Sequence, residues 1–93
     1  MTLTIWKFPI EIKDELEIEI PSPAIPLTFQ MQNSNSVPTL WCLVDPEMGM
    51  VKKKFRLVGT GHKIDKSLEE LKYIGTTQLL HGMLIYHLFE IVS

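Results

Sequence analysis

The chain has 93 residues, of which 45% are hydrophobic and 22% charged, and its formal net charge is −2 with a pI of about 5.9. This length fits one domain with a thin core, and the apolar content is too high for a disordered chain. The slightly acidic balance excludes a broadly basic protein that binds duplex nucleic acid. A thin core leaves apolar surface for a partner subunit, so we expect a homo-oligomer.

The cysteine count and the hydropathy of the sequence indicate the cellular compartment and whether a metal site or a membrane span is expected. Cys42 is the only cysteine, so no intrachain disulfide can form, and a cytosolic setting is expected. No Cys, His and carboxylate cluster at metal spacing accompanies it, so we expect no metal and no cofactor. No apolar run approaches the roughly 18 residues of a membrane span, which argues against contact with a membrane.

Apolar and polar residues alternate with a period of two along most of the chain, which predicts β-strands. In chain order, strands are expected over residues 2–8, 15–20, 27–32, 38–44, 51–60, 72–80 and 83–92. Residues 67–71 suit one helical turn, and His81-Gly82 suits a tight two-residue hairpin turn. Because short links favour antiparallel neighbours, residues 1–93 should form a single all-β domain. We expect a small antiparallel sandwich or open barrel of about seven strands, with little or no helix.

Two of these strands are apolar on both faces, namely those within residues 40–44 and 83–92. A strand of this kind is either central in a sandwich or faces a partner. His87 shares one face of the last strand with Ile85 and Phe89, and we expect it to be a core histidine whose ring nitrogens have partners.

The strand over residues 51–60 carries the clearest pattern of a binding site. If its apolar residues Phe55 and Leu57 point inward, the other face carries a basic stripe in phase with Thr60, formed by Lys52, Lys54 and Arg56. The Gly-Thr-Gly-His segment that follows frees the backbone to turn and to expose amide groups, which bind anions. Candidate phosphate contacts are therefore Arg56, Thr60, Gly61 and His62.

A structural interpretation of the same segment stays open. The glycines could simply end the strand, because the P-loop pattern is absent. An acidic stripe of matching length, formed by Glu15, Glu17 and Glu19, could lie across the sheet from the basic stripe and neutralise it.

Aromatic residues offer stacking surfaces for a base. Trp6 has Lys7 beside it, and Tyr73 carries a ring with a hydroxyl, although burial in the core is the alternative for Trp6. No serine lies in a nucleophile turn and no carboxylate pair stands out as acid and base. Only His62 with Thr60 suggests acid–base chemistry, so we expect no catalytic residues and no enzyme.

Several segments, in the same order and over nearly the whole chain, resemble a family of small phage-encoded proteins. They are residues 5–9 (IWKFP), 40–46 (LWCLVDP), 55–62 (FRLVGTGH), 73–76 (YIGT) and 87–90 (HLFE). Within that family, the chain resembles the anti-CBASS sponges of the fourth described type.

The resemblance implies a homotetrameric, non-catalytic sponge in the host bacterial cytoplasm. It would sequester cyclic dinucleotide signals of bacterial immunity, such as cGAMP, without cutting them. The alternative is a phage protein–protein inhibitor that covers a host target through its apolar strands. In a sponge, Trp6 or Tyr73 would stack on a base, and the phosphate contacts would be Lys7, Arg56, Thr60, Gly61 and His62.

Overall fold

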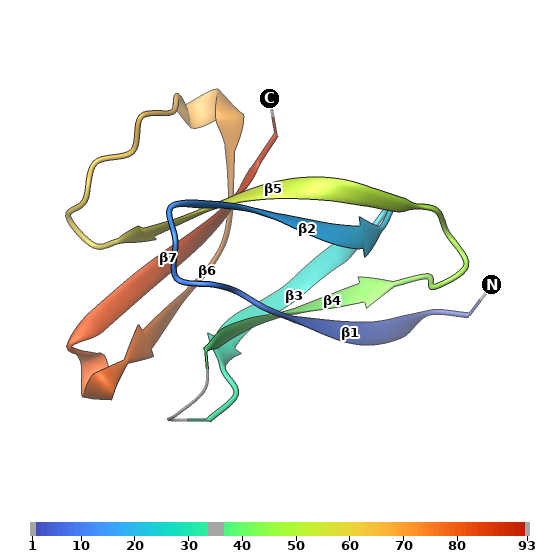
Figure 1. Cartoon of the computed structure of the whole chain (residues 1–93), viewed down its shortest axis with the longest axis horizontal. Coiled ribbons are helices and arrows are strands. Elements are labelled where there is room, and N and C mark those ends of the chain that lie inside the picture. Colours follow the sequence, from blue (N-terminus) through green and yellow to red (C-terminus); the bar gives the residue numbers. More distant parts are fainter. Residues whose placement is uncertain (1, 34–36, 93) are drawn as a thin grey trace.

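The computed structural model describes residues 2–33 and 37–92, which form two antiparallel sheets packed face to face as a sandwich (Figure 1). One sheet has the strand order β1-β4-β3 and the other the order β2-β5-β7-β6. The strands are β1 (Thr4–Pro9), β2 (Glu15–Pro21), β3 (Ile25–Met31), β4 (Pro38–Val44), β5 (Met50–Gly59), β6 (Leu71–Leu79) and β7 (Leu84–Ile91). Two single-turn 3-10 helices, η1 (Leu68–Glu70) and η2 (Leu80–Gly82), complete the described part of the chain. The all-β sandwich prediction is confirmed.

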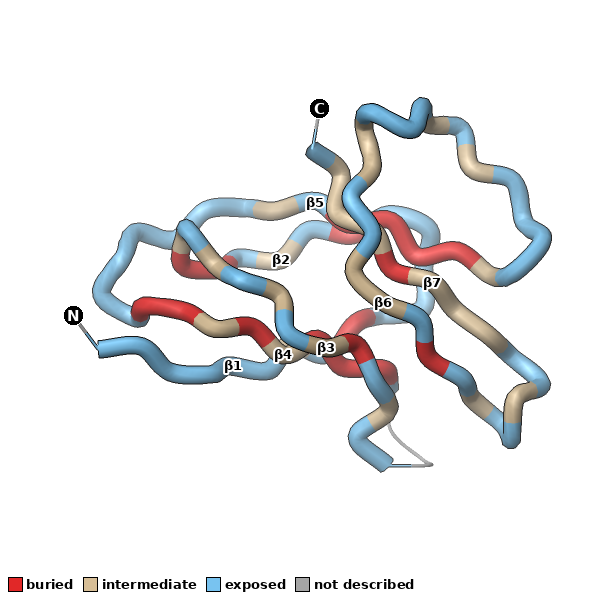
Figure 2. The backbone as a smooth tube through the Cα atoms, turned by 180° about the vertical axis from the view of Figure 1, so that it is seen from behind, coloured by how far each residue is buried: buried red, intermediate tan, exposed pale blue. Residues whose placement is uncertain are grey.

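The alternating pattern acts as expected in each sheet. In β2, Leu16 and Ile20 are buried whereas the three glutamates between and before them are exposed. The buried side chains of both sheets meet in one core, because each sheet has one apolar face to remove from water. In Figure 2, buried segments run along β4 and through the middle of the four-stranded sheet, whereas β1 lies exposed at an edge. The core cluster comprises Ile10, Leu16, Ile20, Phe29, Leu40, Cys42, Val44, Phe55, Leu57 and Leu88.

The two strands that are apolar on both faces take interior positions in the sheets. β4 lies between β1 and β3, and β7 lies between β5 and β6. Both strands are therefore central in their sheets, which is one of the two placements expected for strands of this kind. His87 is different from the expectation, because it lies on β7 outside the core cluster and is only half-buried.

The connection between β6 and β7 is a tight turn around His81 and Gly82, but it is longer than the predicted two residues, because β6 ends at Leu79 and β7 begins at Leu84. Leu80, His81 and Gly82 have φ of 50°, 56° and 87°, and the Met83 amide donates to the Leu80 carbonyl at 3.1 Å. The turn sets the hairpin register, which places Thr76 opposite His87.

Burial of Cys42 in the core gives a test of the packing. Burial, helped by the negative charge of Glu90, raises the pKa of the Cys42 thiol to about 11. Only the thiolate reacts, so at pH 8 about one molecule in a thousand presents the reactive form. We expect Cys42 to react slowly with an aromatic disulfide at pH 8 and rapidly in denaturant, measured by absorbance. Equal rates in native and denatured protein would contradict the buried placement.

Candidate ligand-binding face of the four-stranded sheet

The register of β2 against β5 decides between the two interpretations of the basic stripe. Glu15 lies opposite Arg56, Glu17 opposite Lys54, and Glu19 opposite Lys52. All six alternate with core residues, so they share the outer face of the four-stranded sheet. Opposite charges that face each other across two strands attract, worth about 0.2–1 kcal/mol a pair. The acidic stripe therefore does lie across the sheet from the basic one.

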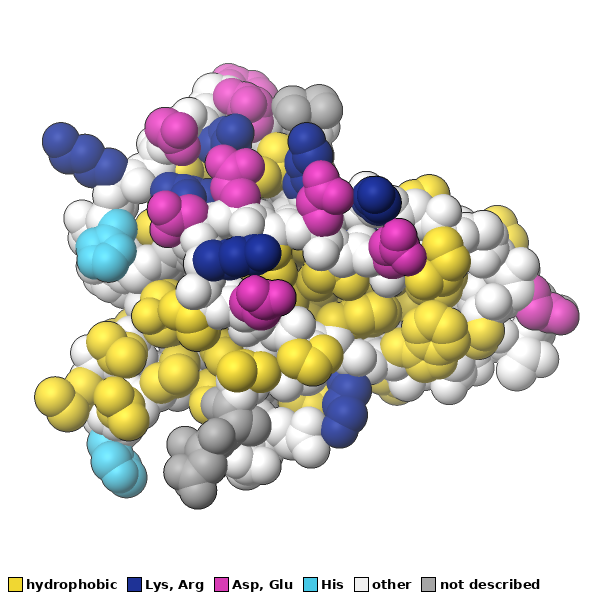
Figure 3. Space-filling model, in the orientation of Figure 1, with side chains coloured by type: hydrophobic (Ala, Val, Ile, Leu, Met, Phe, Trp, Pro, Cys, Tyr) yellow, Lys and Arg dark blue, Asp and Glu magenta, His cyan; other side chains and the backbone are white. Residues whose placement is uncertain are grey.

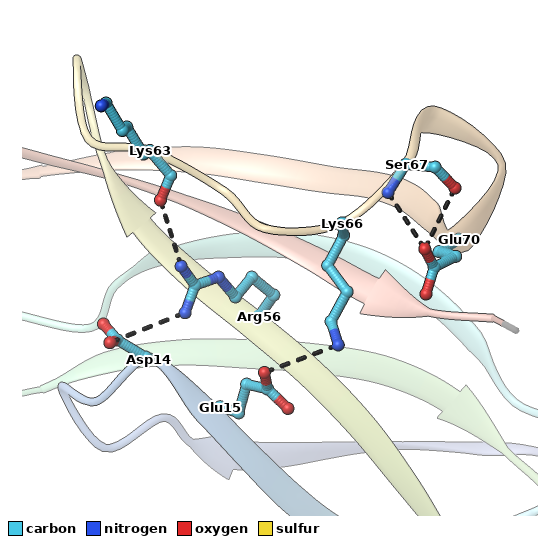
Figure 4. Close-up of polar contacts among 7 residues, drawn as sticks. All are labelled: Asp14, Glu15, Arg56, Lys63, Lys66, Ser67 and Glu70. Atoms are coloured by element: carbon cyan, nitrogen blue, oxygen red, sulfur yellow. Dashed lines mark hydrogen bonds and ion pairs between the residues drawn. The ribbon is translucent and has the colours of Figure 1, made fainter.

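Arg56 is occupied by contacts within the chain (Figure 4). Its Nη1 lies 3.7 Å from Oδ2 of Asp14, and its Nη2 donates to the Lys63 carbonyl at 3.3 Å. The guanidinium side chain is only 9% exposed, and its buried Nε has no hydrogen-bond partner among the described residues. Arg56 thus fastens the segment after β5 onto the outer face rather than pointing freely at solvent.

A second contact holds the same segment. Nζ of Lys66 lies 3.7 Å from a carboxylate oxygen of Glu15, and the chain then enters η1, where Glu70 Oε1 accepts from the Ser67 amide at 3.0 Å (Figure 4). The Ser67 hydrogen bonds lower the pKa of the Glu70 carboxyl. Figure 3 shows the result on the surface, where acidic and basic side chains alternate over β2 and β5. The field there is mixed, which weakens any long-range attraction for anions.

The Gly-Thr-Gly-His segment is a sharp turn at the end of β5. Gly61 has φ 87°, and the His62 amide donates to the Gly59 carbonyl at 3.1 Å. The His62 ring occupies the space where a Gly59 side chain would start, 3.0 Å from that ideal Cβ position. Successive side chains alternate between faces, so a Gly59 side chain would point away from the face of Thr60. The His62 ring, which fills the Gly59 position, therefore lies on the side opposite to Thr60. The turn therefore separates the predicted pair of Thr60 and His62.

Thr60 instead belongs to a chain of hydrogen bonds on the outer face. Its hydroxyl lies 2.6 Å from Nε2 of His87, and Nδ1 of His87 lies 2.8 Å from the Thr76 hydroxyl. The Thr76 hydroxyl lies 2.6 Å from that of Tyr73. We call Thr60, His87, Thr76 and Tyr73 the hydroxyl–imidazole chain. It connects the end of β5 with β7 and β6, and it joins two predicted site residues, Thr60 and Tyr73.

Tyr73 presents a ring as well as a hydroxyl. It is 58% exposed and meets Phe89 edge to face, with ring centroids 5.6 Å apart. In the register of the sheet, Arg56, Phe89 and Tyr73 lie side by side on β5, β7 and β6. The outer face thus combines hydroxyl groups with an exposed aromatic ring, which suits a ligand that has both polar groups and a flat ring.

Trp6 and Lys7 lie elsewhere, on β1 at the edge of the three-stranded sheet. Trp6 pairs with Cys42 and is 37% exposed, whereas Nζ of Lys7 donates to the Gln32 side chain at 2.9 Å. Within one chain, the structure therefore does not bring these two residues to Thr60 and Tyr73, and a site that used all of them would need a second chain.

The outer face of the three-stranded sheet is apolar. Ile5, Ile25 and Leu27 are 56%, 57% and 48% exposed, and they surround the half-buried Trp41 and Leu43 on β4. In Figure 3, apolar side chains gather below the charged region, over β1 and the lower ends of β6 and β7. Exposed apolar side chains thus cover the outer face of the three-stranded sheet and also the β6–β7 hairpin end, whereas charged side chains lie over β2 and β5.

The chemistry open to the hydroxyl–imidazole chain follows from its members. A hydroxyl within reach of an imidazole resembles a nucleophile with its general base. However, the group behind His87 is the neutral Thr76, which cannot stabilise an imidazolium as a carboxylate does. Within residues 2–33 and 37–92, no group of three or more His, Cys, Asp or Glu side chains could hold a metal ion. Binding through hydrogen bonds is the chemistry that this arrangement serves best.

The turn after β5 makes a direct prediction for stability. Replacing Gly61 with alanine forces a side chain into φ 87°, which costs about 1–3 kcal/mol. Gly49→Ala is the matched control, because open space surrounds that position and it lacks a positive φ. Urea unfolding should show a lower midpoint for Gly61→Ala than for Gly49→Ala. Equal midpoints would mean that the turn does not require glycine.

Comparisons with known proteins give a family without a function. No curated protein and no solved structure matches the chain. In the part of the chain that the structure describes, no helix is long and apolar enough to cross a membrane. One family model matches residues 1–93. The chain belongs to the family of the domain of unknown function DUF7352.

Proposed function

We propose that this chain is a non-catalytic phage protein that binds and sequesters a cyclic dinucleotide of the cGAMP class. It acts in the host bacterial cytoplasm, where it removes the signal of CBASS immunity. The observation that carries the proposal is the hydroxyl–imidazole chain, which links Thr60 with Tyr73 on one exposed face. Together with the motif resemblance, it supports phosphate contact at Thr60 and base stacking at Tyr73.

The geometry favours binding at one end of the sheet over binding along the basic stripe. Arg56 is held by Asp14 and by the Lys63 carbonyl, and the two lysines of the stripe face glutamates. A phosphate on the stripe would have to compete with these carboxylates. Thr60 and Gly61 lie beyond them, past the end of β5. In this proposal Thr60 and Gly61 contact the phosphate, and Arg56 holds the adjoining segment in place.

The proposal treats the protein as a sponge, because the group behind the His87 imidazole is the neutral Thr76 hydroxyl and not a carboxylate. A histidine without a carboxylate behind it is a poor general base. The bound nucleotide therefore leaves the protein unchanged.

A homotetramer completes the proposal. The apolar outer face of the three-stranded sheet supports assembly, because exposed apolar faces of this kind mark contacts between proteins. Assembly is also a route by which Trp6 and Lys7 of one chain would approach the polar face of another.

The same apolar face favours a second candidate, a phage inhibitor that covers a host protein. In that case Ile5, Ile25 and Leu27 contact the target, and the hydroxyl–imidazole chain has only a structural role. The sponge depends on the polar outer face and forms a tetramer. The inhibitor depends on the apolar outer face, which contacts the host protein instead of a second copy of the chain.

Nucleotide binding can be measured by calorimetry with a panel of cyclic dinucleotides. We expect heat with at least one cGAMP-like member and recovery of intact ligand after the protein is denatured. Thr60→Val should weaken binding about 10- to 100-fold, because a hydrogen bond to a charged group contributes about 1.5–3 kcal/mol. His81→Asn is the control, since His81 lies in the distant hairpin turn and asparagine tolerates its positive φ. Heat from no member of the panel, or release of a linear product, would refute the sponge.

Assembly can be measured by light scattering of the purified protein. We expect the mass of a tetramer and a smaller species for Ile25→Lys, because a lysine in the apolar face must lose its hydration on assembly. Glu17→Lys, on the polar outer face, serves as the matched control and should leave the mass unchanged. A monomeric wild-type protein whose activity against the host survives Thr60→Val but not Ile25→Lys would favour the inhibitor.

A further inference from the structure

The direction of the hydroxyl–imidazole chain determines what Thr60 offers to a ligand. A neutral histidine donates from one ring nitrogen and accepts at the other. If Nε2 carries the proton, it donates to the Thr60 oxygen, and the Thr60 hydroxyl proton is free for a ligand. If Nδ1 carries the proton, the Thr60 hydroxyl must donate to Nε2 and offers a ligand only its oxygen. Only the first direction suits an oxyanion.

Tyr73 biases the choice between the two directions. A phenol hydroxyl, with a pKa near 10 in general, is a stronger donor and a weaker acceptor than the alcohol of threonine. At 2.6 Å from Thr76, the Tyr73 hydroxyl is therefore the better donor of the pair. The Thr76 hydroxyl then donates a hydrogen bond to Nδ1 of His87, and Nε2–H donates to Thr60. Every hydrogen bond of the chain then points from Tyr73 toward Thr60.

We infer that His87 is a positioning residue, which holds the Nε2–H tautomer and thereby presents the Thr60 hydroxyl as a donor to a tetrahedral oxyanion. The inference rests on the proposed function in that the oxyanion there is a phosphate of the nucleotide. It also names the residue, His87, that sequence reasoning placed in the core. The amide of Gly61 adds a second donor, since among the described residues it donates to no backbone carbonyl.

The first experiment needs no ligand. Ring 15N NMR of the histidines should show His87 protonated at Nε2 and unprotonated at Nδ1 near pH 8. Tyr73→Phe removes the donor that sets the direction and should shift His87 toward the Nδ1–H tautomer, whereas His81→Asn should have no effect. A His87 that carries its proton on Nδ1 in the wild-type protein overturns the inference, whatever the protein binds.

The second experiment uses sulfate, a tetrahedral dianion, at pH 8. We expect sulfate to shift the Thr60 amide and the His87 ring signals, because the Thr60 hydroxyl donates to the oxyanion. Thr60→Val should abolish the response. Thr76→Val should weaken it, and Thr76→Ser, which keeps the hydroxyl, should restore it.

Absence of a sulfate response in the wild-type protein, or a response that survives Thr60→Val, overturns the inference. The sulfate experiment tests the oxyanion site, whereas the nucleotide panel tests the proposed ligand, so either one can fail alone. A sulfate response at Thr60 in a protein that binds no cyclic dinucleotide would refute the proposed ligand and retain the oxyanion site. Binding of a dinucleotide without any change in the His87 ring signals would retain the proposed ligand and refute the oxyanion site.

Discussion

The register of β5 within the four-stranded sheet is the constraint on which both the fold and the candidate site depend. On one side, β5 sets its basic residues opposite the glutamates of β2, and on the other it brings its end beside His87 of β7. A slip of one residue would turn Phe55 and Leu57 out of the core and the charges into it. Core packing thus fixes the register, and the register in turn fixes which polar groups meet on the outer face.

The register of β5 neutralises polar groups along one part of the strand and leaves them available for a ligand at its end. Where β2 runs beside it, each residue of the basic stripe faces a glutamate, and the Arg56 side chain is held in a buried contact with the following segment. Beyond that region, the partner of β5 is β7, which supplies an imidazole and no carboxylate next to Thr60. The groups that remain available for a ligand are therefore hydroxyls and an amide at the turn. The basic residues, which stand out in the sequence, instead stabilise the sheet and its covering segment.

The sequence could predict those features that local periodicity and turn chemistry determine. Alternation in residues 15–20 indicated a half-buried strand, and His81-Gly82 indicated a tight hairpin turn. That turn alone sets Thr76 opposite His87, so part of the hydroxyl–imidazole chain was accessible in principle. The contact of Thr60 with His87 was not, because it depends on the pairing of β5 with β7 across more than twenty intervening residues. The sequence analysis grouped His62 with Thr60, because nothing in the sequence indicates that the His62 ring would fill the space left by the missing Gly59 side chain.

The sandwich also gives this small chain two outer faces that can differ in chemistry. Each sheet contributes its inner face to one shared core, which leaves two outer faces whose residues alternate with core residues and do not contact one another. One of these faces carries charges, hydroxyls and an exposed ring, and the other carries isoleucine and leucine. Substitutions on the apolar face can therefore change assembly without altering the hydrogen bonds around His87. Substitutions in the hydroxyl–imidazole chain likewise leave the apolar face unchanged, since none of its four residues belongs to the three-stranded sheet.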